Sequence, residues 1–295
     1  MAAFGRVHLP PLGGAVEWLN SEPLGPAELR GRVVLVNFWT LTCINWLRQE
    51  PYVRAWSQAY RDDGLVVIGV HTPEFSFEHD IDGVRQAIQE RSIDYPVALD
   101  NDYEVWSAFD NHYWPALYFV DRDGIIRDRH FGEGRYEASE RVIQELLGVE
   151  REPVAVEALG VEAQADWEHL QTPETYLGSA RGEGSGDWTL TGEWAVRREH
   201  VLLERAGGTI SFRFHARDVH LVLSRGAGAP IPFRVRLDGE APGAAHGVDV
   251  DADGSGVLDA GRLYQLVRVP DTVRERTVEI SFLAPGAEAY VFTFG

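Results

Sequence analysis

Cys43 is the residue in this 295-residue chain with the clearest capacity for chemistry, and the chain has a single cysteine. It follows an apolar run over 33–39 and precedes a stretch with helical spacing over 44–60. The first turn of a helix offers unpaired backbone N–H groups and the positive end of the helix dipole, and both favour a thiolate. We therefore predict that Cys43 is a nucleophile at the start of a helix, with no disulfide partner in its own chain.

A second group of candidate ligands lies far along the chain, at Asp249, Asp251 and Asp253. These carboxylates occupy the first, third and fifth positions of a calcium-loop pattern, but the glutamate expected at the twelfth position is Ala260. An acidic hairpin loop is the interpretation we favour, with calcium as the alternative. The histidines show no ligand spacing, so we predict no zinc site and no other cofactor.

The elements that must position Cys43 alternate between strands and helices. β-Branched and aromatic runs predict buried strands, and apolar residues at helical spacing predict helices. A polar Asp121–Gly124 turn between two apolar runs predicts a hairpin. The predicted strands are 33–39, 65–71, 95–99, 116–120 and 125–130, and the predicted helices 44–60, 79–91 and 137–147. Together they predict a mixed sheet with helices on both faces, an α/β fold.

The second half has a different texture. From about Trp188 onward, short runs alternate apolar and polar residues between clusters of Gly, Pro and Asp, without a helical period. This pattern is typical of an antiparallel β-sandwich or jelly roll. We expect an α/β domain over 1–148, a linker over 149–170 and an all-β sandwich over 171–295.

The charge and hydropathy of the sequence argue against some classes of partner and against a membrane span. The formal net charge of −19 argues against nucleic acid, whose phosphates require basic patches. No apolar run approaches the ~18 residues of a membrane span, and the first residues lack the pattern of a signal peptide. We expect a soluble, cytoplasmic protein, or an extracytoplasmic one if the chain is a piece of a membrane-tethered parent.

Several short strings carry a resemblance to a known family: Phe38-Trp-Thr40, Cys43-Ile-Asn45, Ile68–Pro73, Tyr113–Ala116 and Phe131–Gly134. In these strings the first half resembles the thioredoxin-like domain of the DipZ type, among thiol oxidoreductases related to TlpA and ResA. The second half resembles the C-terminal β-sandwich of the same proteins, often described as similar to a carbohydrate-binding module. Its matching strings are 172–178, 261–266 and 289–295.

The resemblance implies roles for particular residues. Family members exchange disulfides through a Cys-x-x-Cys pair, and Cys43 corresponds to the attacking cysteine. Trp46 stands where the resolving cysteine would be, and Pro115 corresponds to a proline that is cis in thioredoxin folds. Because tryptophan cannot expel a substrate from a mixed disulfide, the dithiol cycle is excluded. We expect a substrate groove around Cys43, formed by Trp39, Thr40, Thr42, Trp46, Trp114 and Pro115.

Two kinds of function follow. As an enzyme, Cys43 would exchange with protein or small-molecule thiols and disulfides, or reduce a peroxide through a sulfenic acid. The spacing Thr40-x-x-Cys43 resembles that of peroxiredoxins, but the proline they carry four residues earlier is Val36 here. As a binding protein, the groove would hold a peptide around an inert cysteine, and the sandwich a partner protein or a glycan. Trp167, Trp188 and Trp194 are candidates for sugar stacking, although core packing is their commoner use.

Overall fold

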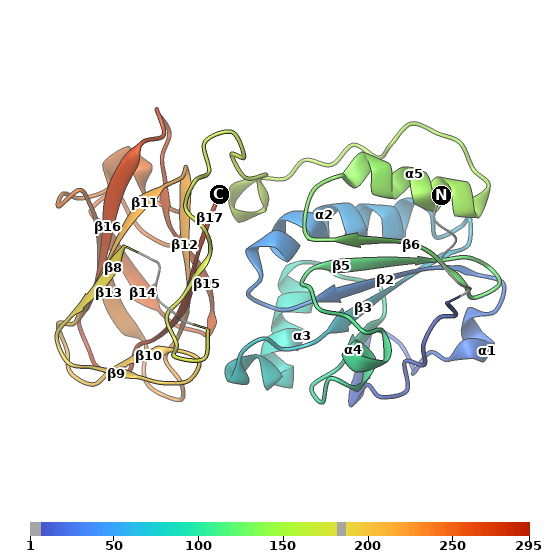
Figure 1. Ribbon diagram of the computed structural model, residues 1–295, viewed down its shortest axis with the longest axis horizontal. Coiled ribbons are helices and arrows are strands. Elements are labelled where there is room, and N and C mark those ends of the chain that lie inside the picture. Colours follow the sequence, from blue (N-terminus) through green and yellow to red (C-terminus); the bar gives the residue numbers. More distant parts are fainter. Residues whose placement is uncertain (1–6, 182–186) are drawn as a thin grey trace. The chain divides into compact units, whose positions relative to one another are not determined.

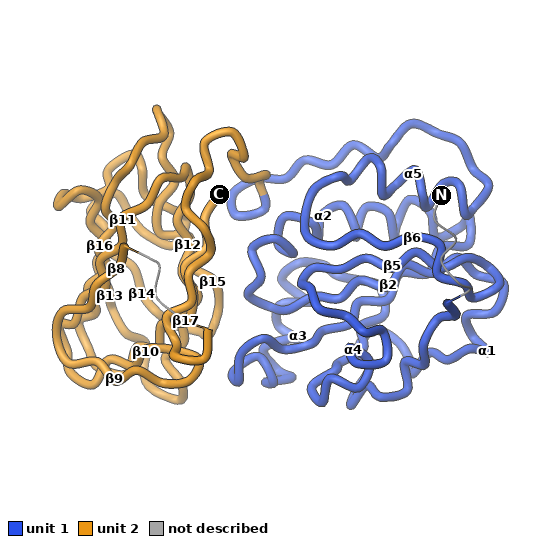
Figure 2. Tube along the Cα trace, in the orientation of Figure 1, with its two compact units in different colours: residues 1–162 blue, residues 163–295 orange. Residues whose placement is uncertain are grey.

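The computed structural model describes residues 7–181 and 187–295. The chain divides into two compact units, residues 1–162 and 163–295, which Figure 2 shows in different colours. The division falls inside the segment 149–170 that the sequence predicts to be a linker. Over the described residues, no helix combines the length and the apolar character that crossing a membrane requires.

The first unit is built on a six-stranded mixed sheet (Figure 1). Its central strand, β2 (Val33–Trp39), pairs parallel with β3 (Leu65–His71) and antiparallel with β5 (Ala116–Val120). The remaining strands are β1 (Glu17–Leu19) and β4 (Val97–Leu99) beyond β3, and β6 (Ile126–Phe131) beyond β5. The parallel β2–β3 pair and the β5–β6 hairpin confirm the predicted α/β fold class.

Helices cover both faces of this sheet. The helices are α1 (Pro26–Leu29), α2 (Ile44–Ala59), α3 (Ile81–Glu90), α4 (Glu104–Ala108) and α5 (Tyr136–Leu147), with a 3-10 turn η1 (Ser76–His79) before α3. In β2, Val34, Val36 and Phe38 pack in one cluster with Leu29 of α1 and Val105 of α4. Because successive side chains of a strand point to opposite faces, Asn37 faces α2 on the other side. The sequence did not predict α1, α4 or β1, which are too short to show a period.

The segment that follows α5 packs against other elements of the first unit. The backbone N–H of Val154 donates to the Glu140 carboxylate at 2.8 Å, and Arg91 forms an ion pair with Glu162 at 3.1 Å. Glu162 ends the 3-10 turn η2 (Gly160–Glu162). These contacts explain why the first unit extends beyond the last residue of α5.

The second unit consists of two antiparallel sheets. One has the order β15-β12-β17-β10-β9, with β7 pairing β17, and the other the order β14-β13-β16-β11-β8. Side chains alternate: Ile210, Phe212 and Phe214 of β11 enter the core while Arg213 is exposed. The strands are β7 (Thr175–Tyr176), β8 (Trp188–Thr191), β9 (Trp194–Val196), β10 (Val201–Leu203), β11 (Thr209–His215), β12 (Asp218–Ser224), β13 (Ile231–Leu237), β14 (Ser255–Leu258), β15 (Arg262–Arg268), β16 (Glu275–Phe282) and β17 (Glu288–Phe294), with a 3-10 turn η3 (Gly243–Ala245). The β-sandwich prediction is confirmed for this unit.

Candidate functional site

Cys43 is the N-cap residue of the 16-residue helix α2 and is partly exposed. Its N–H donates to the Thr40 carbonyl at 3.3 Å, and its carbonyl accepts from the N–H of Leu47 at 3.0 Å. The sulfur therefore sits where a buried strand turns into a long helix, as predicted. Pro51 lies inside α2 without ending it.

The loop before β5 forms one wall beside the sulfur. Cys43 Sγ lies 3.8 Å from the carbonyl oxygen of Trp114, and the Trp114–Pro115 peptide is cis. The Trp114 indole N–H donates to the Thr72 carbonyl at 3.0 Å, and the Thr72 hydroxyl donates to Asp100 at 3.0 Å. Asp100 directly follows β4, is buried, and accepts from the N–H groups of Val105 and Trp106 in α4. Burial raises the pKa of its carboxyl above the ordinary value. These hydrogen bonds connect the loop that carries Trp114 to the end of β4.

A second buried carboxylate, Glu78, holds the turn before Cys43. One of its oxygens accepts from the Thr42 N–H at 3.0 Å and from the Thr42 hydroxyl at 2.9 Å. The other oxygen accepts from the N–H groups of Glu74 at 2.7 Å and Phe75 at 2.9 Å. Glu78 therefore connects the turn before Cys43 to η1.

Trp46 lies beneath the site, fully buried, and stacks on Trp39 with ring centroids 4.2 Å apart. Its indole N–H donates to the Asn37 side-chain oxygen at 3.3 Å, and the Asn37 amide donates to Gln49 at 2.9 Å. Gln49 in turn donates to the carbonyl of Gly132 at 3.2 Å. This chain of side chains contains no titratable group, so it cannot take up or release a proton near neutral pH.

The Gly132 N–H closes the circuit by donating to the Pro115 carbonyl at 2.8 Å. The Gly132 backbone thus connects the buried chain that begins at Trp46 to the wall beside the sulfur. Glu133, the residue after Gly132, forms a buried ion pair with Arg48 at 2.8 Å. Burial raises the pKa of the Glu133 carboxyl, and the neighbouring Arg48 opposes that shift.

The predicted groove residues are brought to one place, but most of them are not open to solvent. Trp39, Thr40, Thr42, Trp46 and Pro115 are buried, and Trp114 is half-buried. The structure therefore places the two tryptophans on the α2 side in the core, where their rings stack, and not on a surface groove. The neutral Asn37–Gln49 pair and the carboxylates of Glu78 and Asp100 were not found from the sequence, because each acts through a contact with a distant segment.

Two exposed aromatic side chains lie next to residues of the loop before β5 and of β5 itself. Tyr113 is 53% exposed and Phe131 is 44% exposed, with ring centroids 4.9 Å apart. Tyr113 precedes Trp114 directly, and Phe131 is the strand partner of Ala116. Neither residue was predicted to belong to the site, although both lie in strings that carry the family resemblance.

Glu50 and His71 are titratable groups buried on the α2 side of the sheet. Burial raises the pKa of the Glu50 carboxyl to about 7, with Arg54 opposing the shift from 3.5 Å away. Burial lowers the pKa of His71 to about 3, so its imidazole, packed edge-on against Trp39, is neutral.

The carboxylates of the calcium-loop pattern are engaged separately. Asp249 pairs with Arg262 at 2.7 Å and accepts from the N–H of Gln265 at 2.8 Å, while Asp251 accepts from the N–H of Ser255 at 2.8 Å. Within the described part of the chain, no group of three or more His, Cys, Asp or Glu side chains is arranged to hold a metal ion. In the structure, Asp249 and Asp251 are thus engaged by Arg262 and by backbone N–H groups.

The tryptophans considered for sugar stacking have different surroundings. Trp188 and Trp194 pack against the sandwich core, whereas Trp167 is 61% exposed. The Trp194 indole N–H also donates to the Thr191 carbonyl at 2.9 Å. Trp188 and Trp194 are therefore packing residues of the sandwich core, which is the commoner role of tryptophan in such a fold.

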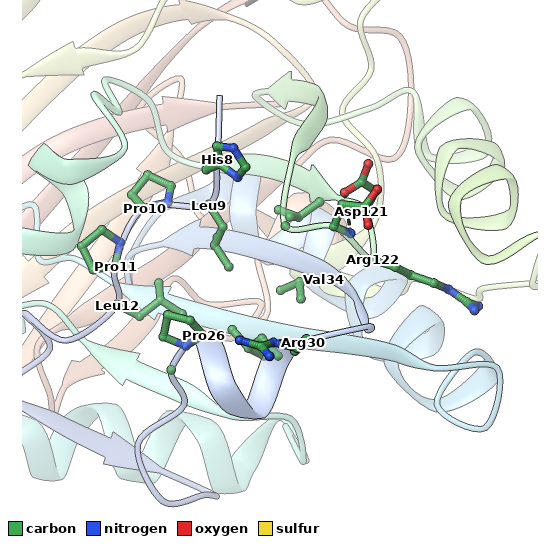
Figure 3. Close-up of a pocket in the computed structure, with 15 residues that line it drawn as sticks. His8, Leu9, Pro10, Pro11, Leu12, Pro26, Arg30, Val34, Asp121 and Arg122 are labelled. Atoms are coloured by element: carbon green, nitrogen blue, oxygen red, sulfur yellow. Dashed lines mark hydrogen bonds between the residues drawn. The ribbon is translucent and has the colours of Figure 1, made fainter. Parts of the chain in front are cut away.

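The first unit contains a cavity of about 250 Å³, whose lining residues are drawn in Figure 3. Leu9, Leu12 and Val34 line it, with Arg30 and Asp121 among its polar residues. Val34 is at the opposite end of β2 from the turn to Cys43, roughly 16 Å of strand away. This cavity contributes nothing to the surroundings of the sulfur.

Comparison with known proteins identifies both halves. A family model described as "Redoxin" matches residues 19–147, and one described as "Thioredoxin like C-terminal domain" matches residues 183–295. Thiol-disulfide oxidoreductase YkuV of Bacillus subtilis is 31% identical over 129 residues, covering 44% of this chain and 85% of YkuV. Protein DipZ of Mycobacterium tuberculosis is 36% identical over 240 residues, covering 72% of this chain and 34% of DipZ. The chain belongs to the DipZ-type thioredoxin-like family.

This DipZ-type chain spans about a third of the length of the DipZ proteins it matches. The solution structure of a thioredoxin-like protein in its oxidised form aligns with a TM-score of 0.45 at 30% identity. That alignment covers 49% of this chain and 98% of the other. The family membership extends over both units, because the two family models match one half of the chain each.

Proposed function

We propose that this protein is a thiol-disulfide exchanger that acts through the single thiol of Cys43. The observation that carries the proposal is the placement of the sulfur, partly exposed at the start of α2 and 3.8 Å from the Trp114 carbonyl. The helix N-terminus favours the thiolate, and the thiolate is the form that attacks a disulfide. YkuV and other relatives of this chain are named thiol-disulfide oxidoreductases, which supports the same chemistry.

The exchange has two steps. The Cys43 thiolate attacks one sulfur of a substrate disulfide, forms a mixed disulfide with it and expels the other sulfur as a thiolate. A second, external thiolate then attacks the mixed disulfide, pairs with the substrate sulfur and returns Cys43 as a thiolate. No net electrons are left on the protein, so the cycle needs only a disulfide and a free thiol.

The second step must be external because of Trp46. We propose that this residue occupies the place of the resolving cysteine, since it lies one helical turn from Cys43 and is fully buried. Its indole N–H donates to Asn37, which in turn donates to Gln49. These hydrogen-bonded side chains offer the sulfur neither a thiol nor a titratable group that could take its proton. Mixed disulfides at Cys43 should therefore be long-lived until an external thiol arrives.

Mass spectrometry tests the proposal. The protein is incubated with glutathione disulfide, and the mass of the intact chain is followed, then reduced glutathione is added. We expect one glutathione adduct, absent in Cys43→Ser, that forms faster at pH 7 than on an unstructured cysteine peptide and is removed by reduced glutathione. A reaction no faster than that of the peptide would overturn the proposal and favour a binding protein with an inert cysteine.

A further inference from the structure

Glu78 is a fully buried carboxylate with four hydrogen-bond donors around it. Two donors come from Thr42, which immediately precedes Cys43, and two are the backbone N–H groups of Glu74 and Phe75. Burial raises the pKa of Glu78, and the N–H of Phe75 lowers it. Three backbone N–H groups can only donate, so the geometry suits an ionised carboxylate that accepts from all of them.

Thr42 is itself 2% exposed and has both of its donors on one Glu78 oxygen. The bond to its N–H fixes the backbone of the turn, and the bond to its hydroxyl fixes the side-chain rotamer. On the other side, the Cys43 N–H is held by the Thr40 carbonyl. The turn that delivers the sulfur to α2 is thus restrained by an element, η1, that is remote in sequence.

We propose that Glu78 is a positioning residue for Cys43. By holding Thr42, it keeps the sulfur over the first turn of α2 and against the Trp114 carbonyl. This inference rests on the proposed function, in which the Cys43 thiolate is the attacking group. Glu78 acts through Thr42 and needs no contact with the substrate.

Substitutions at the two residues separate this role from general destabilisation. A glutamine at 78 has one acceptor oxygen and one NH₂ group, so either Thr42 or the Glu74–Phe75 pair loses its acceptor. Thr42→Val removes the hydroxyl donor and leaves the charge of Glu78 in place, whereas Thr42→Ser keeps the donor. Comparing valine with serine therefore isolates the hydrogen bond.

Glu140 supplies a matched control in the same unit. It is also a buried carboxylate, and it accepts from Trp56 at 3.0 Å, Tyr60 at 2.6 Å and the N–H of Val154 at 2.8 Å. Its donors lie in the last turns of α2 and after α5, away from the turn at 40–43. Glu140→Gln should lower stability without moving Cys43.

The experiment measures the rate of reaction of Cys43 with iodoacetamide and with glutathione disulfide from pH 6 to 9. The proteins are the wild type, E78Q, T42V, T42S, the E78Q/T42V double variant and E140Q, each checked for folding by circular dichroism. We expect E78Q and T42V each to slow both reactions at pH 7 by about fivefold, roughly the net worth of one hydrogen bond. The double variant should be no slower than the slower single variant, because both substitutions break the same link, through Glu78, between Thr42 and the backbone at 74–75. T42S should recover the rate that T42V loses, and E140Q should stay within twofold of the wild type.

Two results would overturn the inference: effects of E78Q and T42V that multiply in the double variant, or an equal loss of rate in E140Q. Failure of the proposed function is a different outcome. In that case the wild type does not react with glutathione disulfide, while the iodoacetamide rates still report whether Glu78 positions the thiol. The dependence of the iodoacetamide rate on pH is a further readout, which a general loss of stability should not change. Loosening of the turn should shift the pH at which the rate rises in T42V and not in E140Q.

Discussion

The indole N–H of Trp46 donates to the side-chain oxygen of Asn37 at 3.3 Å. Through Gln49 and Gly132 this bond is continuous with the Pro115 carbonyl, beside the sulfur of Cys43. Trp46 is therefore part of the framework of the site and not a bulky residue left beside it. Any return to a dithiol site must replace both its volume and its hydrogen bond.

Trp46→Cys tests that relationship. Removing a fully buried tryptophan leaves a cavity, and we expect the free energy of unfolding to fall by about 3–5 kcal/mol in urea titrations. The new thiol lies one turn from Cys43, so a glutathione adduct should be lost from the variant without an added thiol. A disulfide between Cys43 and the introduced cysteine should be left in its place.

Trp56→Cys is the matched control for that variant. Trp56 is also fully buried in α2 and its indole donates to Glu140 at 3.0 Å, but it lies several turns from Cys43. It should lose a similar amount of stability and keep its adduct. If both variants keep the adduct, position 46 is not where a resolving thiol can act.

Glu50 should make stability depend on pH. Its folded pKa of about 7 lies above the ordinary 4.5, so between these values the folded protein binds the proton more tightly than the unfolded chain. Stability is therefore lost as pH rises from 4.5 through 7, by about 3 kcal/mol. Relative to the wild type, Glu50→Gln should gain that amount between pH 4.5 and pH 8. Leu47→Val, which removes no titratable group from α2, should differ from the wild type by an amount that does not change with pH.

His71 should act in the opposite direction on acidification. Its folded pKa of about 3 lies below the ordinary 6.5, so the unfolded chain binds the proton first. Stability is lost as pH falls below 6.5, by about 2 kcal/mol at pH 5. In His71→Leu this loss between pH 7 and pH 5 should be absent, as measured by urea unfolding at both values. An unchanged pH dependence in the variant would show that His71 is not the neutral buried imidazole that its surroundings indicate.

A side chain at Gly69 should destabilise the first unit. A Cβ on this β3 residue would lie 3.0 Å from the Trp39 indole nitrogen and 3.1 Å from the Tyr95 ring. Both rings are fully buried, so neither can move into solvent. We expect Gly69→Ala to cost about 1–3 kcal/mol in thermal or urea unfolding. Gly124→Ala is a useful comparison, because a Cβ there meets nothing within 4 Å and only the positive φ of 76° resists it.

The sequence alone determined the position of Cys43, because strand and helix periods are local and the cysteine stands where one period changes to the other. It also determined that no second thiol exists and that the two halves differ in fold class. Those conclusions depend on residue order and composition, and the structure confirms the α/β and β-sandwich classes.

Only the tertiary structure decided what surrounds the sulfur. Glu78, Asp100 and the Asn37–Gln49 pair act through hydrogen bonds between segments far apart in the chain, which no local pattern encodes. It also decided that Trp39 and Trp46 stack in the core, because burial of a large ring depends on the packing of α2 against the sheet. The order of residues supplied the thiol, and packing between distant elements supplied the restraints around it.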